Sequence, residues 1–126
     1  MTLQGLTYTF HEQHIHEFVM HNMHNTTMGA FFDHLEMLQD KQPRHEVLRL
    51  LIQPSGIGSI QYVIARAKAL RQKYPAHRSR VAIVYAPSVQ GHFLQMAMRG
   101  IASMTTTSTS MFPKPQLVEA MVWLAH

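Results

Sequence analysis

The chain has 126 residues and a mass of 14.5 kDa, which is the size of one domain. It contains no cysteine, which excludes a disulfide scaffold, a thiolate metal site and a cysteine nucleophile. Apolar residues make up 46% and charged residues only 14% of the chain, so we expect a folded domain with a largely neutral surface. Residues 1–40 hold acidic side chains and histidines but no lysine or arginine, whereas residues 44–80 are basic.

The first ten residues lack both the basic start and the apolar stretch of a secretory signal. No apolar run approaches the ~18 residues of a membrane span. We therefore expect a soluble cytoplasmic protein.

In the first third of the chain, alternation of apolar and polar residues predicts strands over residues 6–10 and 15–20. A tight turn at Glu12-Gln13 would join them, although it lacks the usual glycine. A helix follows, for which Asn25, Thr26 and Thr27 offer N-caps. Its apolar stripe consists of Met28, Phe31, Phe32, Leu35 and Leu38.

The remaining elements alternate between strand and helix. Aliphatic runs predict buried strands over residues 47–52 and 81–86, and helical periodicity predicts a helix over residues 60–74 between them. We expect a further helix from Pro87 to Met104 and an exposed or edge strand over residues 105–112. A last helix starts near Pro115, with Leu117, Val118, Met121 and Leu124 as its apolar stripe.

The predicted order is β-β-α-β-α-β-α-β-α in a single domain. Strands separated by helices imply parallel pairing, and the opening hairpin adds an antiparallel pair. We therefore predict an α/β fold with a mixed sheet of about five strands and helices packed on it. The strands near residues 50 and 83 should lie side by side at its centre.

Three stretches carry a family resemblance. An aliphatic strand runs into a Ser-Gly turn over residues 47–58, and Arg-Val-Ala-Ile-Val follows the basic helix at residues 80–84. Near the end, Met111-Phe112 precede the Glu-Ala-Met-Val-Trp-Leu of residues 119–124. These stretches resemble the SpoIIAA-like family of the STAS-related superfamily, and the similarity in element order spans nearly the whole chain. The resemblance implies a STAS-like α/β fold.

The resemblance also implies a regulatory site. In anti-sigma-factor antagonists a partner kinase phosphorylates a serine that precedes a glycine at the mouth of the second helix, and Ser55 matches that place. The acidic residue usual near the turn is missing, since Gln53 and Pro54 stand there. We therefore expect a partner-binding or anion-binding loop formed by Gln53, Ser55, Gly56, Gly58 and Ser59.

The residues themselves leave two interpretations of this loop open. Backbone N–H groups at a helix start attract anions, and a phosphate on Ser55 would add about −1.5 to −2 charge there. Alternatively, Ser55 or Ser59 simply caps the helix, and the glycines permit the turn.

The N-terminal histidines raise the question of a metal site. His14 and His16 would share one face of a strand, close to Glu12 and Glu17. Their spacing matches no metal signature, so we predict neither a metal nor another cofactor, and keep His14 and His16 as weak candidates.

Two other surfaces suggest partners. The basic helix spreads its charges over a solvent face without interleaved aromatic residues, so an acidic protein partner is favoured over nucleic acid. The ten methionines, among them Met28, Met37, Met96, Met98 and Met104, suggest an apolar patch for a partner, a second copy of the chain or a lipid-like ligand.

The sequence contains no convincing catalytic set, since no nucleophile elbow presents a serine. We therefore expect a non-catalytic, cytoplasmic bacterial regulatory module that binds a partner protein, such as a kinase or an anti-sigma-like regulator, and is switched at Ser55. The alternative is a carrier or sensor of an apolar, lipid-like small molecule.

Overall fold

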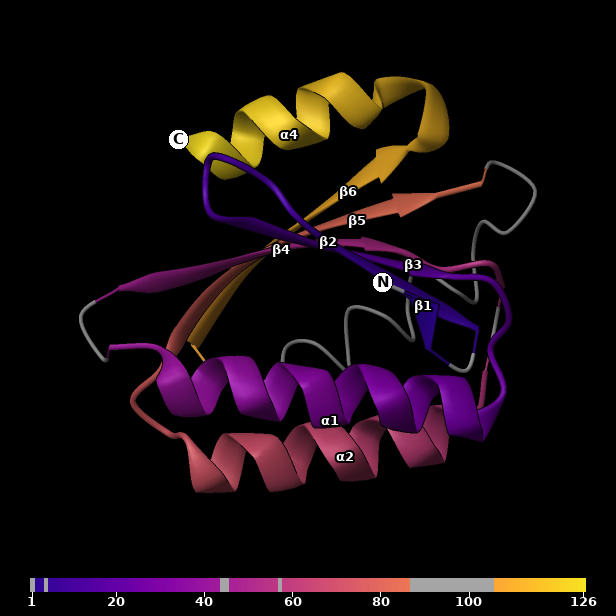
Figure 1. Ribbon diagram of the computed structural model, residues 1–126, viewed down its shortest axis with the longest axis vertical. Coiled ribbons are helices and arrows are strands. Elements are labelled where there is room, and N and C mark those ends of the chain that lie inside the picture. The colour runs from indigo at the N-terminus through magenta and orange to yellow at the C-terminus, as the bar shows by residue number, and fades with distance from the viewer. Residues whose placement is uncertain (1, 4, 44–45, 57, 87–105) are drawn as a thin grey trace.

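A computed structural model describes residues 2–3, 5–43, 46–56, 58–86 and 106–126. In this part of the chain, a mixed sheet lies between helices α1 and α2 on one face and helix α4 on the other (Figure 1). The described strands are β1 (Thr2–Leu3), β2 (Leu6–Phe10), β3 (Ile15–Met20), β4 (Val47–Gln53), β5 (Arg78–Tyr85) and β6 (Thr106–Pro113). The described helices are α1 (Asn25–Lys41), α2 (Ile60–Lys73) and α4 (Leu117–Ala125), the last preceded by a 3₁₀ turn over Lys114–Gln116. Among these, no helix combines the length and the apolar composition needed to cross a membrane.

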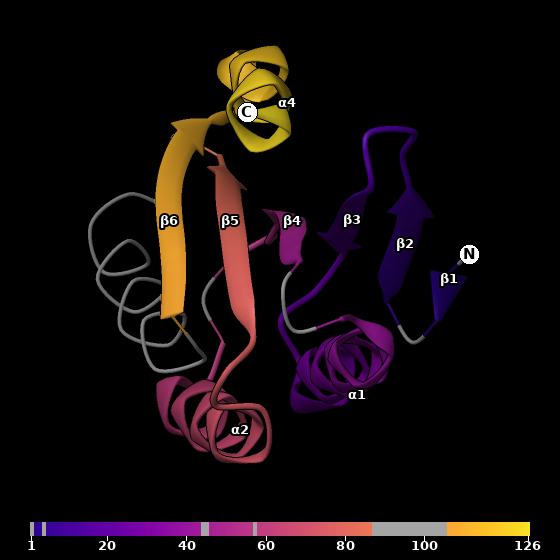
Figure 2. The ribbon, with the colours of Figure 1, turned by 90° about the vertical axis from the view of Figure 1, so that its left-hand side faces the viewer.

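The strands follow one another across the sheet in the order β1-β2-β3-β4-β5-β6 (Figure 2). The first three pair antiparallel, and β3 to β6 pair parallel. Leu50 lies opposite Val81 and Ile52 opposite Ile83, so the two aliphatic strands are central neighbours. The predicted α/β class and mixed sheet are confirmed. The short strand β1 was not predicted because two residues give no periodic signal.

Alternate residues of β4 point into two separate cores. Leu50 and Ile52 join the core beneath α1 and α2, whereas Leu51 joins the core beneath α4. All three are at least 94% buried, and burying one such side chain contributes about 1.5–3 kcal/mol. This explains why β4 has a continuous aliphatic run instead of an alternating pattern.

Two arginines of the sheet hold the end of α4. Arg49 donates from Nε to the Leu124 carbonyl at 2.8 Å, and Arg80 donates from Nε and Nη2 to the Trp123 carbonyl at 3.0 and 2.8 Å. The Arg80 guanidinium also lies 3.8 Å from the centroid of the Trp123 ring. Because carbonyls in the last turn of a helix have no partner within it, these bonds fix α4 against β4 and β5.

The predicted apolar stripe of α4 is wrong at one position. Ala120 and Leu124 are the buried residues of this helix, while Val118 is 72% exposed and Val122 is 52% exposed. The helix is apolar nearly all round, so periodicity did not identify which side meets the sheet.

The start of α1 also differs from the prediction. Asn25, Thr26 and Thr27 lie inside the helix, and the N-cap is His24, whose side chain makes no capping bond. Instead the Asn22 side-chain oxygen accepts hydrogen bonds from the His24 backbone N–H at 3.1 Å and from the Thr27 hydroxyl at 2.5 Å. A residue outside the helix thus orders its first turn. The helix predicted from Pro87 to Met104 lies outside the described residues.

Candidate functional site

The loop of residues 54–59 lies at the carboxyl edge of the parallel strands. Because α1 follows β3 and α2 follows β4, and these strands are parallel, both helices begin at this edge. Gly58 is in close contact with the start of α1: a Cβ there would lie 2.7 Å from the Met28 Sδ and 2.9 Å from the Met23 carbonyl oxygen. At Gly56 the added Cβ would meet only the Met23 Cγ, at 3.9 Å. The loop is therefore packed against the neighbouring connection on its Gly58 side.

The two serines of the loop have different roles. Ser59 is the N-cap of α2, and its Oγ accepts a hydrogen bond from the Tyr62 backbone N–H at 3.3 Å. Ser55 is exposed, and its hydroxyl makes no hydrogen bond within the described part of the chain. The capping interpretation therefore applies to Ser59. The expectation that Ser55 stands at the helix start is wrong, since it lies in the loop four residues before the cap.

Gln53 is part of the sheet and not of the loop. It is the last residue of β4, and its Nε2 donates to Glu17 Oε2 at 2.5 Å. The other Glu17 oxygen lies 2.9 Å from His11 Nε2. Gln53 thus anchors the strand from which the loop departs.

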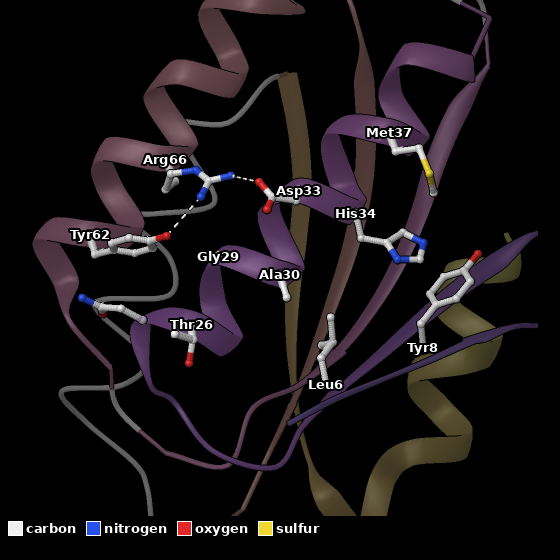
Figure 3. A pocket seen from close by; sticks show the side chains of 11 residues that line it. Leu6, Tyr8, Thr26, Gly29, Ala30, Asp33, His34, Met37, Tyr62 and Arg66 are labelled. Carbon is white, nitrogen blue, oxygen red and sulfur yellow. Dashed lines mark hydrogen bonds and ion pairs between the residues drawn. The ribbon is translucent and has the colours of Figure 1, made fainter. Parts of the chain in front are cut away.

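The first turns of α1 and α2 contain no acidic residue. The positive ends of the two helix dipoles therefore lack compensating carboxylates of their own. Further along the two helices, Arg66 of α2 donates to Asp33 of α1 at 2.6 Å and to the Tyr62 hydroxyl at 3.0 Å (Figure 3). This bridge is partly solvated, since the Asp33 side chain is 73% exposed.

A hollow of about 650 Å³ begins beside this bridge and extends over α1 to strand β2. Figure 3 shows its walls: Leu6 and Tyr8 from β2 face Ala30, His34 and Met37 from α1 across it. A second hollow of about 630 Å³ lies at the other end of α1, where Phe10, His14 and His16 meet Leu38 and Lys41.

Two histidines and a tyrosine lie where the two hollows approach each other. The Tyr8 hydroxyl and His16 Nδ1 are 2.7 Å apart, and the Tyr8 and His34 ring centroids are 4.1 Å apart. Burial, followed by the charges of the nearby His34 and His14, lowers the pKa of His16 from 6.5 to about 4. Burial, followed by the charge of Lys41, also lowers the pKa of His34. Both imidazoles are therefore neutral at pH 7, and the buried Nε2 of His34 makes no hydrogen bond in the described part of the chain.

The histidine pair does not share a strand face as predicted. His14 lies in the hairpin turn with φ +59°, and β3 begins one residue later. It thus occupies the left-handed position that glycine often takes in such turns. In the described ranges, no three His, Asp or Glu side chains are grouped so as to hold a metal ion.

Sequence reasoning missed His34 and Tyr8 because both fit a core pattern. Tyr8 belongs to the alternation of β2, and His34 lies three residues after Phe31 at the margin of the α1 stripe. Of the methionines, Met28 is buried in the core, whereas Met37 is 44% exposed at the wall of the first hollow. Met96, Met98 and Met104 lie outside the described residues.

No protein-family model matches the chain, and no curated protein and no solved structure matches it either. The similarity to SpoIIAA-like proteins therefore remains a prediction from the sequence.

Proposed function

We propose that this chain is a non-catalytic, cytoplasmic regulatory module with a STAS-like fold. A partner protein binds the loop that follows β4, and phosphorylation of Ser55 changes its affinity. The observation that carries the proposal is the exposed Ser55 hydroxyl, which makes no hydrogen bond to any described residue and lies on a loop whose other serine caps α2. A kinase can reach such a hydroxyl, and its modification leaves the cap and the packing at Gly58 intact.

The electrostatics of the edge support a switch of this kind. A phosphate on Ser55 would bring about −1.5 to −2 charge and three acceptor oxygens to the edge where α1 and α2 begin. Since neither first turn holds a carboxylate, the added charge meets no acidic neighbour there. It would change the surface potential presented to a partner without requiring the domain to refold.

The test combines modification and binding. The intact mass of the protein isolated from its native cells should show a phosphorylated fraction, and peptide mapping should place the phosphate on Ser55. Ser55→Ala and Ser55→Asp should then differ in the partner that they retain after cross-linking and affinity purification from the same cells.

The matched control is Ser108→Asp, which adds the same charge at an exposed serine of β6. It should retain the partner as the parent protein does. Equal retention by all of these variants, together with an unmodified Ser55, would overturn the proposal.

A further inference from the structure

A continuous series of rings lines the gap between α1 and the sheet edge at β2. In order, these rings are those of His34, Tyr8, His16, Phe10 and His14, which we call the aromatic row. Successive centroids are 4.1, 5.9, 4.8 and 5.8 Å apart. The row connects the two hollows, because His34 and Tyr8 line the first, and His16, Phe10 and His14 line the second.

The row lies on a face of the sheet that should be covered. Phe10 points to the same side of β2 as Leu6, which is only 2% exposed in the core under α1. Yet Phe10 is 53% exposed, and Met37 across the gap on α1 is 44% exposed. Two of the four large apolar side chains that the described structure leaves exposed thus border the same groove.

The groove carries little net charge. Asp33 and Arg66 pair with each other at one end. At the other end Lys41 and Glu46 line the second hollow with opposite signs, and Arg49, which also lines it, donates from Nε to the Leu124 carbonyl. Between them, burial lowers the pKa of His16 and of His34, which favours the neutral form of these two imidazoles near pH 7. Because charges of both signs stand at each end, an ionised ligand would lose hydration without meeting a site of one sign.

We propose that the groove along the aromatic row binds an uncharged, largely apolar small molecule that contains an aromatic ring. Hollows of about 650 and 630 Å³ are of the size that encloses such a ligand. The rings of Tyr8, Phe10 and His16 offer faces and edges for stacking, and Met37 offers an adaptable apolar contact. Ser55 lines neither hollow, so this site is distinct from the phosphorylation site proposed above.

The experiment compares two fluorescent probes that differ by one charge. N-phenyl-1-naphthylamine is uncharged, and 1-anilinonaphthalene-8-sulfonate is the same ring system with a sulfonate. Titration of the folded full-length chain at pH 7 should show at least tenfold tighter binding of the uncharged probe. With ¹⁵N,¹³C-labelled protein, the same titration should shift the ring signals of Tyr8 and His34.

Two variants locate the probe. Met37→Glu, at an exposed wall position that leaves the core intact, should weaken binding of the uncharged probe at least tenfold. Val118→Glu, which changes the 72% exposed valine of α4 on the opposite face, should leave the affinity unchanged. Circular dichroism of both variants checks that they are folded.

Three results would overturn the proposal. The first is that neither probe binds the folded protein. The second is that the sulfonate binds as tightly as the uncharged probe or more tightly. The third is that Val118→Glu loses binding while Met37→Glu keeps it, which would assign the apolar site to α4.

Discussion

Protonation of His16 should make the protein less stable as the pH falls below neutral. The ring is half-buried between Tyr8 and Phe10, and burial lowers its pKa from 6.5 to about 4. In the unfolded chain the imidazole takes up a proton as the pH falls through 6.5, whereas in the folded protein it stays neutral until about pH 4. The unfolded state therefore binds more protons in this window, and the free energy of unfolding must decrease.

The magnitude follows from the two pKa values. Between pH 7 and pH 5 the full shift corresponds to a loss of about 2 kcal/mol. Because solvent screens a half-buried ring, we expect about 1 kcal/mol from His16. The lowered pKa of His34 adds a loss of the same sign.

Urea unfolding at pH 7, 6 and 5 measures this effect, and a range above pH 5 keeps most carboxylates ionised. His16→Phe keeps a ring against Phe10 and Tyr8 but cannot be protonated, so its free energy of unfolding should fall less between pH 7 and pH 5 than that of the parent. At pH 7 it should be less stable than the parent by about 1 kcal/mol, because the hydrogen bond between the Tyr8 hydroxyl and His16 is lost, and this difference should shrink as the pH falls to 5.

His24→Asn removes an exposed imidazole and serves as the control for the loss of one titratable ring. Parallel pH profiles for the parent and His16→Phe would refute the reasoning. So would an imidazole titration of His16, followed by NMR, with its midpoint at or above 6.5.

Three further substitutions, two of them with a matched control substitution, test the loop and the second core by urea unfolding at pH 7. Ser59→Ala should lower the free energy of unfolding by about 1 kcal/mol through loss of the α2 cap, while Ser55→Ala should change it by less than about 0.5 kcal/mol. Equal losses in the two variants would contradict the separate roles of the two serines. Gly58→Ala should lower the free energy of unfolding by about 1–3 kcal/mol, because its Cβ would come too close to the Met23 backbone carbonyl and to the buried Met28 side chain, whereas the nearby Gly56→Ala, with an ordinary contact, should cost clearly less. Arg80→Ala should cost about 1–3 kcal/mol because the end of α4 loses two hydrogen bonds and the contact with its indole; an unchanged midpoint would show that α4 needs no such anchor.

For the candidate sites, the sequence predicted the loop better than the groove. The strand–Ser-Gly–helix order fixed where the loop occurs, because buried strands and amphipathic helices leave a direct periodic signal. The sequence left open whether Ser55 or Ser59 caps α2, because serine is a common N-cap residue and both serines precede the predicted helix. The groove gave no signal, because Tyr8 and His34 follow the same periodicities as core residues.

The sequence by itself determined strands β2 to β6, helices α1, α2 and α4, and the central pairing of β4 with β5. Period-two and period-3.6 patterns follow from the geometry of strands and helices, and aliphatic runs such as residues 47–52 are stable only when both faces are covered. Only the tertiary structure decided how far each helix covers the sheet. The packing of α1 leaves Phe10 exposed at the edge, α4 turns Val118 to solvent, and the hairpin places His14 at a positive φ. These outcomes depend on contacts between residues distant in the chain, which local periodicity does not encode.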